Sequence, residues 1–267
     1  MTSGANGRTP GRPEQSRQRD RTVRRRRRRR RSTLFKPIVY IIMVAVMAAG
    51  ISVFFKISHI EIKGNIRYTA GDIIAASGLK EGDNLIFINA FQISNKIFRQ
   101  LPYVHEATIS RRLPDTVVIG IEESYPLASV AFGAGYYIID KNCKILEKTD
   151  RSGSIGTITV KGIEPILPKV GERLALSQEA HHKVTYLSEL LTAILSRQMQ
   201  ADIGDIDMTD SGNAAFSYLG RFTIELGKQE GIDYKLEQLD EVLSQLSAGE
   251  TGRIILAADR EPHFIPN

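Results

Sequence analysis

The chain has 267 residues, of which 42% are hydrophobic and 25% charged, with a formal net charge of +6. Residues 1–36 hold thirteen Arg and one Lys against Glu14 and Asp20, a net charge of +12, which leaves −6 for residues 37–267. This distribution excludes a general attraction of the whole protein for nucleic acid, because the positive charge lies in one tail. A single cysteine, Cys143, excludes an internal disulfide.

The N-terminal tail, residues 1–36, is predicted to be disordered and basic. Its first twenty residues, MTSGANGRTPGRPEQSRQRD, contain hardly an apolar side chain, so burial cannot offset the entropy of ordering them. Eight consecutive arginines follow, from Arg24 to Arg31. RNA or DNA could bind such a run through phosphates, but no aromatic or base-reading side chains are interleaved with it, so no specific nucleic acid is expected. Anionic lipid of the inner leaflet fits the same charges.

A transmembrane helix is predicted over residues 37–56. Pro37 to Phe55 are nineteen residues without a charge, bracketed by Lys36 and Lys56. At about 1.5 Å per residue they reach roughly 28 Å, enough to cross the hydrocarbon core of a bilayer. The arginines and Lys36 place the N-terminus in the cytoplasm and the following residues outside. Residues 47–50, MAAG, could serve as the cleavage site of a signal peptide, but the apolar run continues beyond them and favours an uncleaved anchor.

Residues 57–123 read as strand, helix, helix, strand, strand. ISHIEIKG alternates, and Thr69 starts a helix with Asp72 in a capping box. Asn89 can cap a second helix that Pro102 stops. The segments HEATISRR and TVVIGIEE are two strands joined by Leu113-Pro114-Asp115. A three-stranded sheet with two helices on one face buries both sets of apolar stripes.

The stretch LPYVHEATISRRLPDTVVIGIEESYP resembles the end of the POTRA domain of the FtsQ family, called DivIB in Gram-positive bacteria. The shared features are a Pro-Tyr-Val turn, a strand closing on Arg-Arg-Leu-Pro-Asp-Thr, and a last strand ending in Ile-x-Glu. The order of basic tail, single span and POTRA domain adds to the likeness. The resemblance implies an α+β protein with a POTRA domain over residues 57–125 and an FtsQ/DivIB β domain over residues 126–267.

The second domain is expected to be a mixed sheet with two packed helices. In the turn Lys141-Asn142-Cys143 the cysteine occupies a position where the family usually has glycine, which favours a positive φ there. Two amphipathic helices are predicted, from Ser177 to about Gln198 and in GIDYKLEQLDEVLSQLS. The strands are expected in LASVAF, YYIID, KILEK, GDIDMTDSGNAAFSYLGRFTIELGK as three, RIILAA and PHFIP. Ile254-Ile255-Leu256 departs from the family's usual Ile-Asp-Leu.

No catalytic, cofactor or metal site is predicted. Cys143 could be a nucleophile, but no histidine lies in a recognisable signature with it. His181 and His182 are helix neighbours that point about 100° apart, which suits no shared metal. A calcium loop starting at Asp207 would place Tyr218 at its twelfth position, where a glutamate is needed.

The resemblance implies a non-enzymatic scaffold of the division apparatus, a single-pass protein at the septum that binds partners along a strand edge. The implied partners are FtsB/DivIC-like and FtsL-like proteins, and through them the septal peptidoglycan synthase; no small-molecule substrate is expected. Two alternatives remain open: a membrane-anchored cell-wall enzyme, and a POTRA-containing translocation component. In the family the last strand carries the main contact, which here implies Ala258, Arg260, Pro262, His263, Phe264 and Ile265, with Phe264 as the apolar anchor and Arg260 and His263 at the rim.

Overall fold

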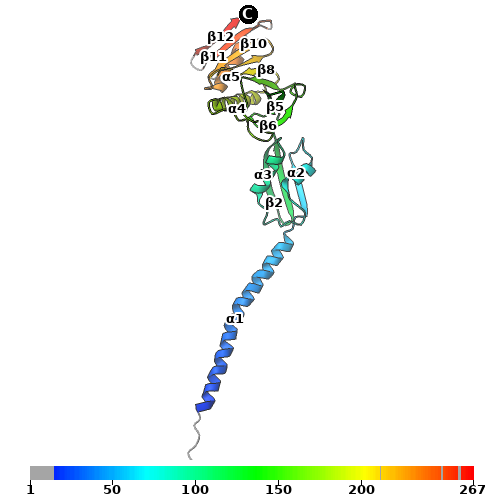
Figure 1. Cartoon of the computed structure of the whole chain (residues 1–267), viewed down its shortest axis with the longest axis vertical. Coiled ribbons are helices and arrows are strands. Elements are labelled where there is room, and N and C mark those ends of the chain that lie inside the picture. Colours follow the sequence, from blue (N-terminus) through cyan, green and yellow to red (C-terminus); the bar gives the residue numbers. More distant parts are fainter. Residues whose placement is uncertain (1–14, 211, 248, 258–259) are drawn as a thin grey trace, which may run out of the picture. The chain divides into compact units, whose positions relative to one another are not determined.

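The computed structural model describes residues 15–267 except 211, 248, 258 and 259, and the side chains of residues 15–34, Ala257 and Arg260 lie outside that description. The chain divides into two compact units, Met1–Lys56 and Ile57–Asn267. Helices and strands alternate irregularly along the described residues (Figure 1). The prediction of an α+β fold is confirmed.

The first unit contains helix α1 (Gln15–Phe54), in which Phe35–Phe54 is long and apolar enough to cross a membrane, with a mean hydropathy of 2.4. The helix also includes residues 15–36, where the composition predicts disorder. Arginine and glutamine are good helix formers, and a helix already nucleated adds further residues at little cost. Pro37 consequently lies inside α1 and not at its start. The rest of the predicted disordered tail, residues 1–14, lies outside the described residues.

The second unit begins with what we call the first segment, residues 57–125. Its elements are β1 (His59–Lys63), α2 (Ala70–Ser77), α3 (Ala90–Gln100), β2 (Val104–Arg112) and β3 (Thr116–Glu123). The sheet order is β1-β3-β2, with β1 parallel and β2 antiparallel to β3. The predicted order of elements is confirmed.

Both predicted helix starts in this segment are confirmed. The Thr69 hydroxyl accepts a hydrogen bond from the Asp72 amide, and the Asp72 carboxylate accepts one from the Thr69 amide, which is a complete capping box. The Asn89 side chain accepts from the Gln92 amide at the start of α3. Both helices bury their apolar sides, since Ile73 and Ile97 have no exposed surface.

The second segment, residues 126–267, is built on a nine-stranded mixed sheet. Its strands are β4 (Ala128–Phe132), β5 (Gly135–Ile139), β6 (Ile145–Thr149), β7 (Ile158–Lys161), β8 (Ile203–Asp207), β9 (Ala214–Tyr218), β10 (Phe222–Gly227), β11 (Gly252–Ala257) and β12 (Arg260–Pro266). Their order is β12-β11-β10-β9-β8-β7-β4-β5-β6. The last strand of the chain therefore lies at one end of the sheet.

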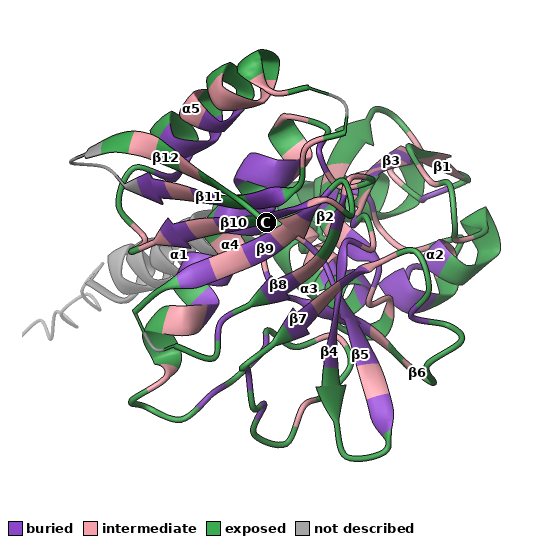
Figure 2. Ribbon diagram, turned by 90° about the horizontal axis from the view of Figure 1, so that it is seen from above, coloured by how far each residue is buried: buried purple, intermediate pink, exposed green. Residues whose placement is uncertain are grey.

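Helices α4 (His181–Ser196) and α5 (Ile232–Gln245) share one continuous apolar core with this sheet. Figure 2 shows buried residues along β8 to β11, whereas much of α5 is exposed. The predicted start of this helix at Ser177 is wrong: α4 begins at His181, after a turn in which the Ala180 amide donates to the Ser177 carbonyl. A serine side chain competes as readily in a turn as at a helix start, so its presence alone does not fix the boundary.

Candidate partner-binding site

The residues predicted to set membrane topology all fall on or beside α1. Arg24 and Arg31 lie in its N-terminal part, although their side chains are outside the described set. Lys36 and Lys56 are exposed, and they stand near the two ends of the apolar stretch Phe35–Phe54. Length and composition thus support a single membrane anchor formed by this helix.

The predicted partner-binding residues fall on β12, which pairs along one side with β11 and is the last strand of the sheet, drawn in red in Figure 1. At the sheet's other end, the start of β6 is covered, because the Ile145 amide donates to the Glu172 carbonyl at 2.9 Å and, just before the strand, the Leu174 amide donates to the Cys143 carbonyl at 2.8 Å. Among the described strands β12 pairs with β11 alone, so its other side is an open edge of the nine-stranded sheet.

The direction of the backbone groups along β12 follows from its register. The Asn267 amide donates to the Thr251 carbonyl at 3.1 Å, and Arg253 faces Ile265. Hydrogen-bonded and non-bonded residue pairs alternate in an antiparallel ladder, so Ile265 bonds toward β11 while Phe264 and Pro266 direct their backbone groups outward. The Gly252 amide supports this assignment, since it donates away from β12, to the Arg221 carbonyl.

Two prolines limit what this edge can donate. Pro266 has no N–H, and it lies at an outward position where the ladder to β11 needs none. Pro262 lies at the register shift between β11 and β12, the other place where an edge strand tolerates proline. The edge therefore offers the N–H of Phe264 and the carbonyls of Phe264 and Pro266 to an added strand.

The side chains of β12 divide between the two faces of the sheet. Phe264 is half-buried and packs on the core, with its ring centroid 6.2 Å from that of Phe222. His263 and Ile265 are exposed on the opposite face. Of the other predicted contacts, Ala258 and the side chain of Arg260 lie outside the described residues. The ring of Phe264 thus fixes β12 to its own sheet, and its backbone faces outward.

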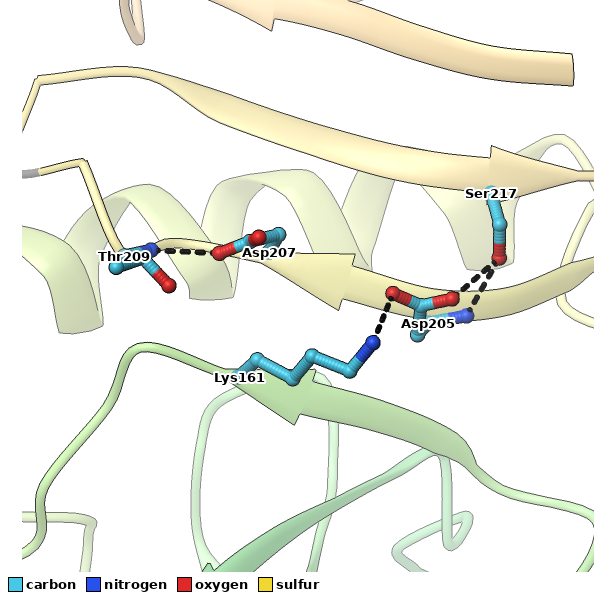
Figure 3. Close-up of polar contacts among 5 residues, drawn as sticks. All are labelled: Lys161, Asp205, Asp207, Thr209 and Ser217. Carbon is cyan, nitrogen blue, oxygen red and sulfur yellow. Dashed lines mark hydrogen bonds and ion pairs between the residues drawn. The ribbon is translucent and has the colours of Figure 1, made fainter.

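The face of the sheet away from the helices is polar and internally paired (Figure 3). Lys161 donates to the Asp205 carboxylate at 2.9 Å, and the Ser217 hydroxyl donates to the other Asp205 oxygen at 2.7 Å. The Thr209 amide donates to Asp207 at 2.8 Å, and hydrogen bonding to Thr209 lowers the pKa of Asp207. These pairs are solvated and contribute little stability. The acidic stretch forms a strand and a turn.

The candidates for catalysis and metal binding take structural places. Burial raises the pKa of the Cys143 thiol to about 12, so the thiol is neutral at physiological pH, and its sulfur lies 3.7 Å from the Val184 carbonyl. Its φ is 59°, which confirms the predicted positive φ in that turn. His181 and His182 are exposed neighbours at the start of α4. Among the described side chains, no group of three or more His, Cys, Asp or Glu is placed to hold a metal ion.

The structure assigns roles to residues that the sequence pattern left without one. The Glu123 carboxylate at the end of β3 accepts hydrogen bonds from three successive amides, those of Ile66, Arg67 and Tyr68, at 2.8 to 3.3 Å. The Arg111 guanidinium donates to the Leu85 and Ile88 carbonyls at 2.9 and 2.7 Å. Both residues belong to the motifs quoted above, so these motifs hold the first segment together.

The two segments of the second unit are joined by buried polar contacts. Lys144, only 6% exposed, donates to the Val104 carbonyl at 2.7 Å and lies 3.6 Å from the centre of the Phe98 ring. Desolvation lowers the pKa of Lys144 to about 8, against an attraction by Asp140 that raises it. The Ser124 hydroxyl donates to the Asp140 carboxylate at 2.8 Å. Such contacts explain why residues 57–267 form one compact unit.

Comparison with known proteins agrees with this architecture. The family model described as "POTRA domain, FtsQ-type" matches residues 55–124. The cell division protein DivIB of Clostridium tetani is 27% identical over 192 residues, which cover 72% of this chain and 71% of the relative. DivIB of Clostridium acetobutylicum is 25% identical over 212 residues, 79% of this chain and 83% of the relative. The cell division protein FtsQ of Syntrophotalea carbinolica is 23% identical over 196 residues, 72% of this chain and 67% of the relative. Residues 55–124 thus match a POTRA domain of the FtsQ type, and about three quarters of the chain is similar to proteins named as the cell division proteins DivIB and FtsQ.

Proposed function

We propose that this protein is a non-enzymatic scaffold that anchors in the cell membrane and recruits or regulates other division proteins at the septum. The basic residues before the apolar helix favour a cytoplasmic N-terminus, with residues 57–267 outside the cytoplasm. Its working parts would be a cytoplasmic tail over residues 1–36, a span over 37–56, a POTRA domain over 57–125 and a β domain over 126–267. Kinship to proteins named for cell division supports the process.

The open edge of β12 is the observation that carries the proposed mechanism. An extended partner segment can add a tenth strand there, donating to the carbonyls of Phe264 and Pro266 and accepting from the Phe264 N–H. Main-chain hydrogen bonds of this kind supply affinity for many sequences. Few donors on the edge also discourage pairing of two copies through β12, because each copy would lack N–H groups to offer the other.

Specificity would come from side chains beside the edge. Exposed His263 and Ile265 flank an added strand on one face of the sheet, and Pro262 sets the end of the regular pairing. Ala258 and Arg260 would extend the contact toward the start of β12. Phe264 would act through its backbone, and its ring would hold the strand in place. We propose FtsB/DivIC-like and FtsL-like proteins as the partners, which would connect this scaffold indirectly to the septal peptidoglycan synthase.

A crosslinking experiment in cells tests this proposal. A photo-crosslinking amino acid replaces Ile265 beside the edge or, as a matched control, Glu241 on the exposed side of α5. The proposal predicts an adduct with an FtsB/DivIC-like protein from position 265 and none from position 241. Adducts from position 241 alone would move the contact to the helices, and equal yields at both positions would contradict binding at a strand edge.

A further inference from the structure

Four exposed apolar side chains gather at one end of the first segment. They come from the turn before α3, from the first turn of α3 and from the turn between β2 and β3. Their exposed fractions are 41% for Ile86, 76% for Phe87, 75% for Phe91 and 61% for Leu113, and we call these four residues the apolar rim. Large exposed aromatic side chains concentrated at one place on a small domain indicate a contact surface.

The rim surrounds the residues at which the chain enters this segment. The Ile57 amide donates to the Asp83 carbonyl, and the Gly82 amide donates to the Ile57 carbonyl, both at 2.8 Å. On the other side, the Ser58 amide donates to the Asp115 carbonyl at 2.9 Å. The turn that carries Phe87 and the turn that carries Leu113 therefore both lie beside Ile57 and Ser58.

The rim is held rigidly, so its exposure is a property of the fold. Leu85 is fully buried, and the Arg111 guanidinium bonds the carbonyls on both sides of the rim residues, at Leu85 and Ile88. The Asn84 side chain accepts from the Ile86 amide at 2.9 Å, and its carbonyl accepts from the Phe87 amide at 3.1 Å. These hydrogen bonds hold the backbone of the turn, while the side chains of Ile86 and Phe87 are exposed.

Chain length places this end of the segment near the membrane surface. Helix α1 and its apolar stretch end at Phe54, and only Phe55 and Lys56 separate it from buried Ile57. The three residue steps from Phe54 to Ile57 reach at most about 11 Å. The headgroup layer on each side of the hydrocarbon core is roughly 5 to 8 Å thick. Given the anchor argued under the proposed function, the turns bonded to Ile57 must lie within or next to that layer.

We propose that the apolar rim inserts into the outer headgroup layer of the membrane that holds α1, as a second, interfacial contact with lipid. The rim would contact lipid through its apolar side chains and not through charge, because the basic and acidic side chains at this end of the segment are equal in number. Arg112, for example, is paired with Glu61 at 2.8 Å. The others at this end are basic Lys56, Lys80 and Arg111 and acidic Glu81, Asp83 and Asp115. Two contacts with lipid, the span and the rim, hold the first segment on the bilayer more firmly than the span alone can.

The absence of tryptophan from the chain gives a direct test. The full chain is reconstituted in vesicles of neutral phosphatidylcholine whose acyl chains carry bromine, a quencher of indole fluorescence. Three variants each carry one tryptophan: Phe87→Trp in the rim, Phe54→Trp at the end of the span, and Ile66→Trp, 90% exposed at the opposite end of the segment. The proposal predicts that F87W emission shifts to shorter wavelength and is quenched, whereas I66W emission matches that of tryptophan in water.

Each other outcome overturns the proposal in a recognisable way. Quenching of F54W with an unquenched F87W would remove the rim contact and leave the membrane anchor intact. An unquenched F54W would remove the anchor and the rim together. Quenching of F87W only when anionic lipid is added, or only at low salt, would replace apolar insertion by charge. A shift of F87W emission to shorter wavelength without quenching, and absent at one chain per vesicle, would show that a second copy covers the rim.

Discussion

Replacing Glu123 by alanine tests the three amide hydrogen bonds to its carboxylate, which we call the brace of the first segment. The carboxylate accepts from the amides of Ile66, Arg67 and Tyr68, and it thereby ties the loop between β1 and α2 to the end of β3. The same loop carries Arg67, whose guanidinium lies 3.8 Å from the centre of the Tyr103 ring and 3.3 Å from the Glu147 carboxylate in the second segment. Loss of the brace should loosen this junction as well.

The expected cost is about 1.5 to 3 kcal/mol of unfolding free energy, the usual value for hydrogen bonds to a charged acceptor. Three separate bonds would suggest more, but Ile66 and Arg67 are exposed, so water replaces part of what their amides lose. Glu122→Ala is the matched control, because Glu122 is exposed and precedes Glu123 in the same strand. A surface substitution of that kind usually changes stability by less than about 0.5 kcal/mol.

The assay is urea unfolding of the fragment Ile57–Asn267, followed by circular dichroism for the two variants and the parent. Glu123→Gln adds a graded test, since the amide oxygen still accepts hydrogen bonds but carries no charge, and its midpoint should fall between those of the parent and E123A. If E123A unfolds at the same urea concentration as E122A, the brace does not stabilise the segment and this reading of the Ile-x-Glu motif is refuted.

Two further predictions concern Lys144 and Cys143. The pKa of Lys144 is about 8 in the folded protein, below the ordinary 10.5, so between these pH values the unfolded chain binds the extra proton. The unfolding free energy of the parent, minus that of Lys144→Met, should therefore increase as pH rises from 8 to 10.5, as measured by urea unfolding. A difference that does not change with pH would contradict a lowered pKa of the buried Lys144 amine. Cys143 has a positive φ and is fully buried. Glycine relieves a strain of about 1 to 2 kcal/mol but gives up a buried side chain of similar value. Cys143→Gly should thus unfold near the parent in urea, and Cys143→Ala, which keeps the strain, should unfold below C143G; the reverse order would contradict the strain.

Much of the fold was predictable because local chemistry determines it. Thr69 and Asp72 form a capping box in any context that allows a helix, and Asn89 caps in the same way. Alternation in TVVIGIEE gave the buried face of β3, where Val117, Ile119 and Ile121 are buried. Where two local preferences compete, the pattern was insufficient: Ser177 lies in a turn ahead of α4, and the arginine run continues α1.

The orientation of β12 could not be predicted, because it depends on register with a distant strand. From the sequence alone, an aromatic residue near a sheet edge is equally consistent with a partner contact and with packing on the core. Only the pairing of Ile254 with Phe264, next to Phe222, places the ring inward and the backbone outward. The role of Glu123 was hidden for the same reason, since its three donors lie more than fifty residues earlier in the chain.

The most direct measurement of the central claim compares Phe264→Pro with Phe264→Ala for binding to the extracytoplasmic segment of an FtsB/DivIC-like partner. Both variants lose the ring that packs on Phe222, at a similar cost in stability, but only proline removes the outward N–H. With both variants shown to be folded by circular dichroism, the account predicts that F264P binds at least about fivefold more weakly than F264A, since one backbone hydrogen bond contributes about 1 kcal/mol. Equal affinities for the two variants would contradict strand addition at β12.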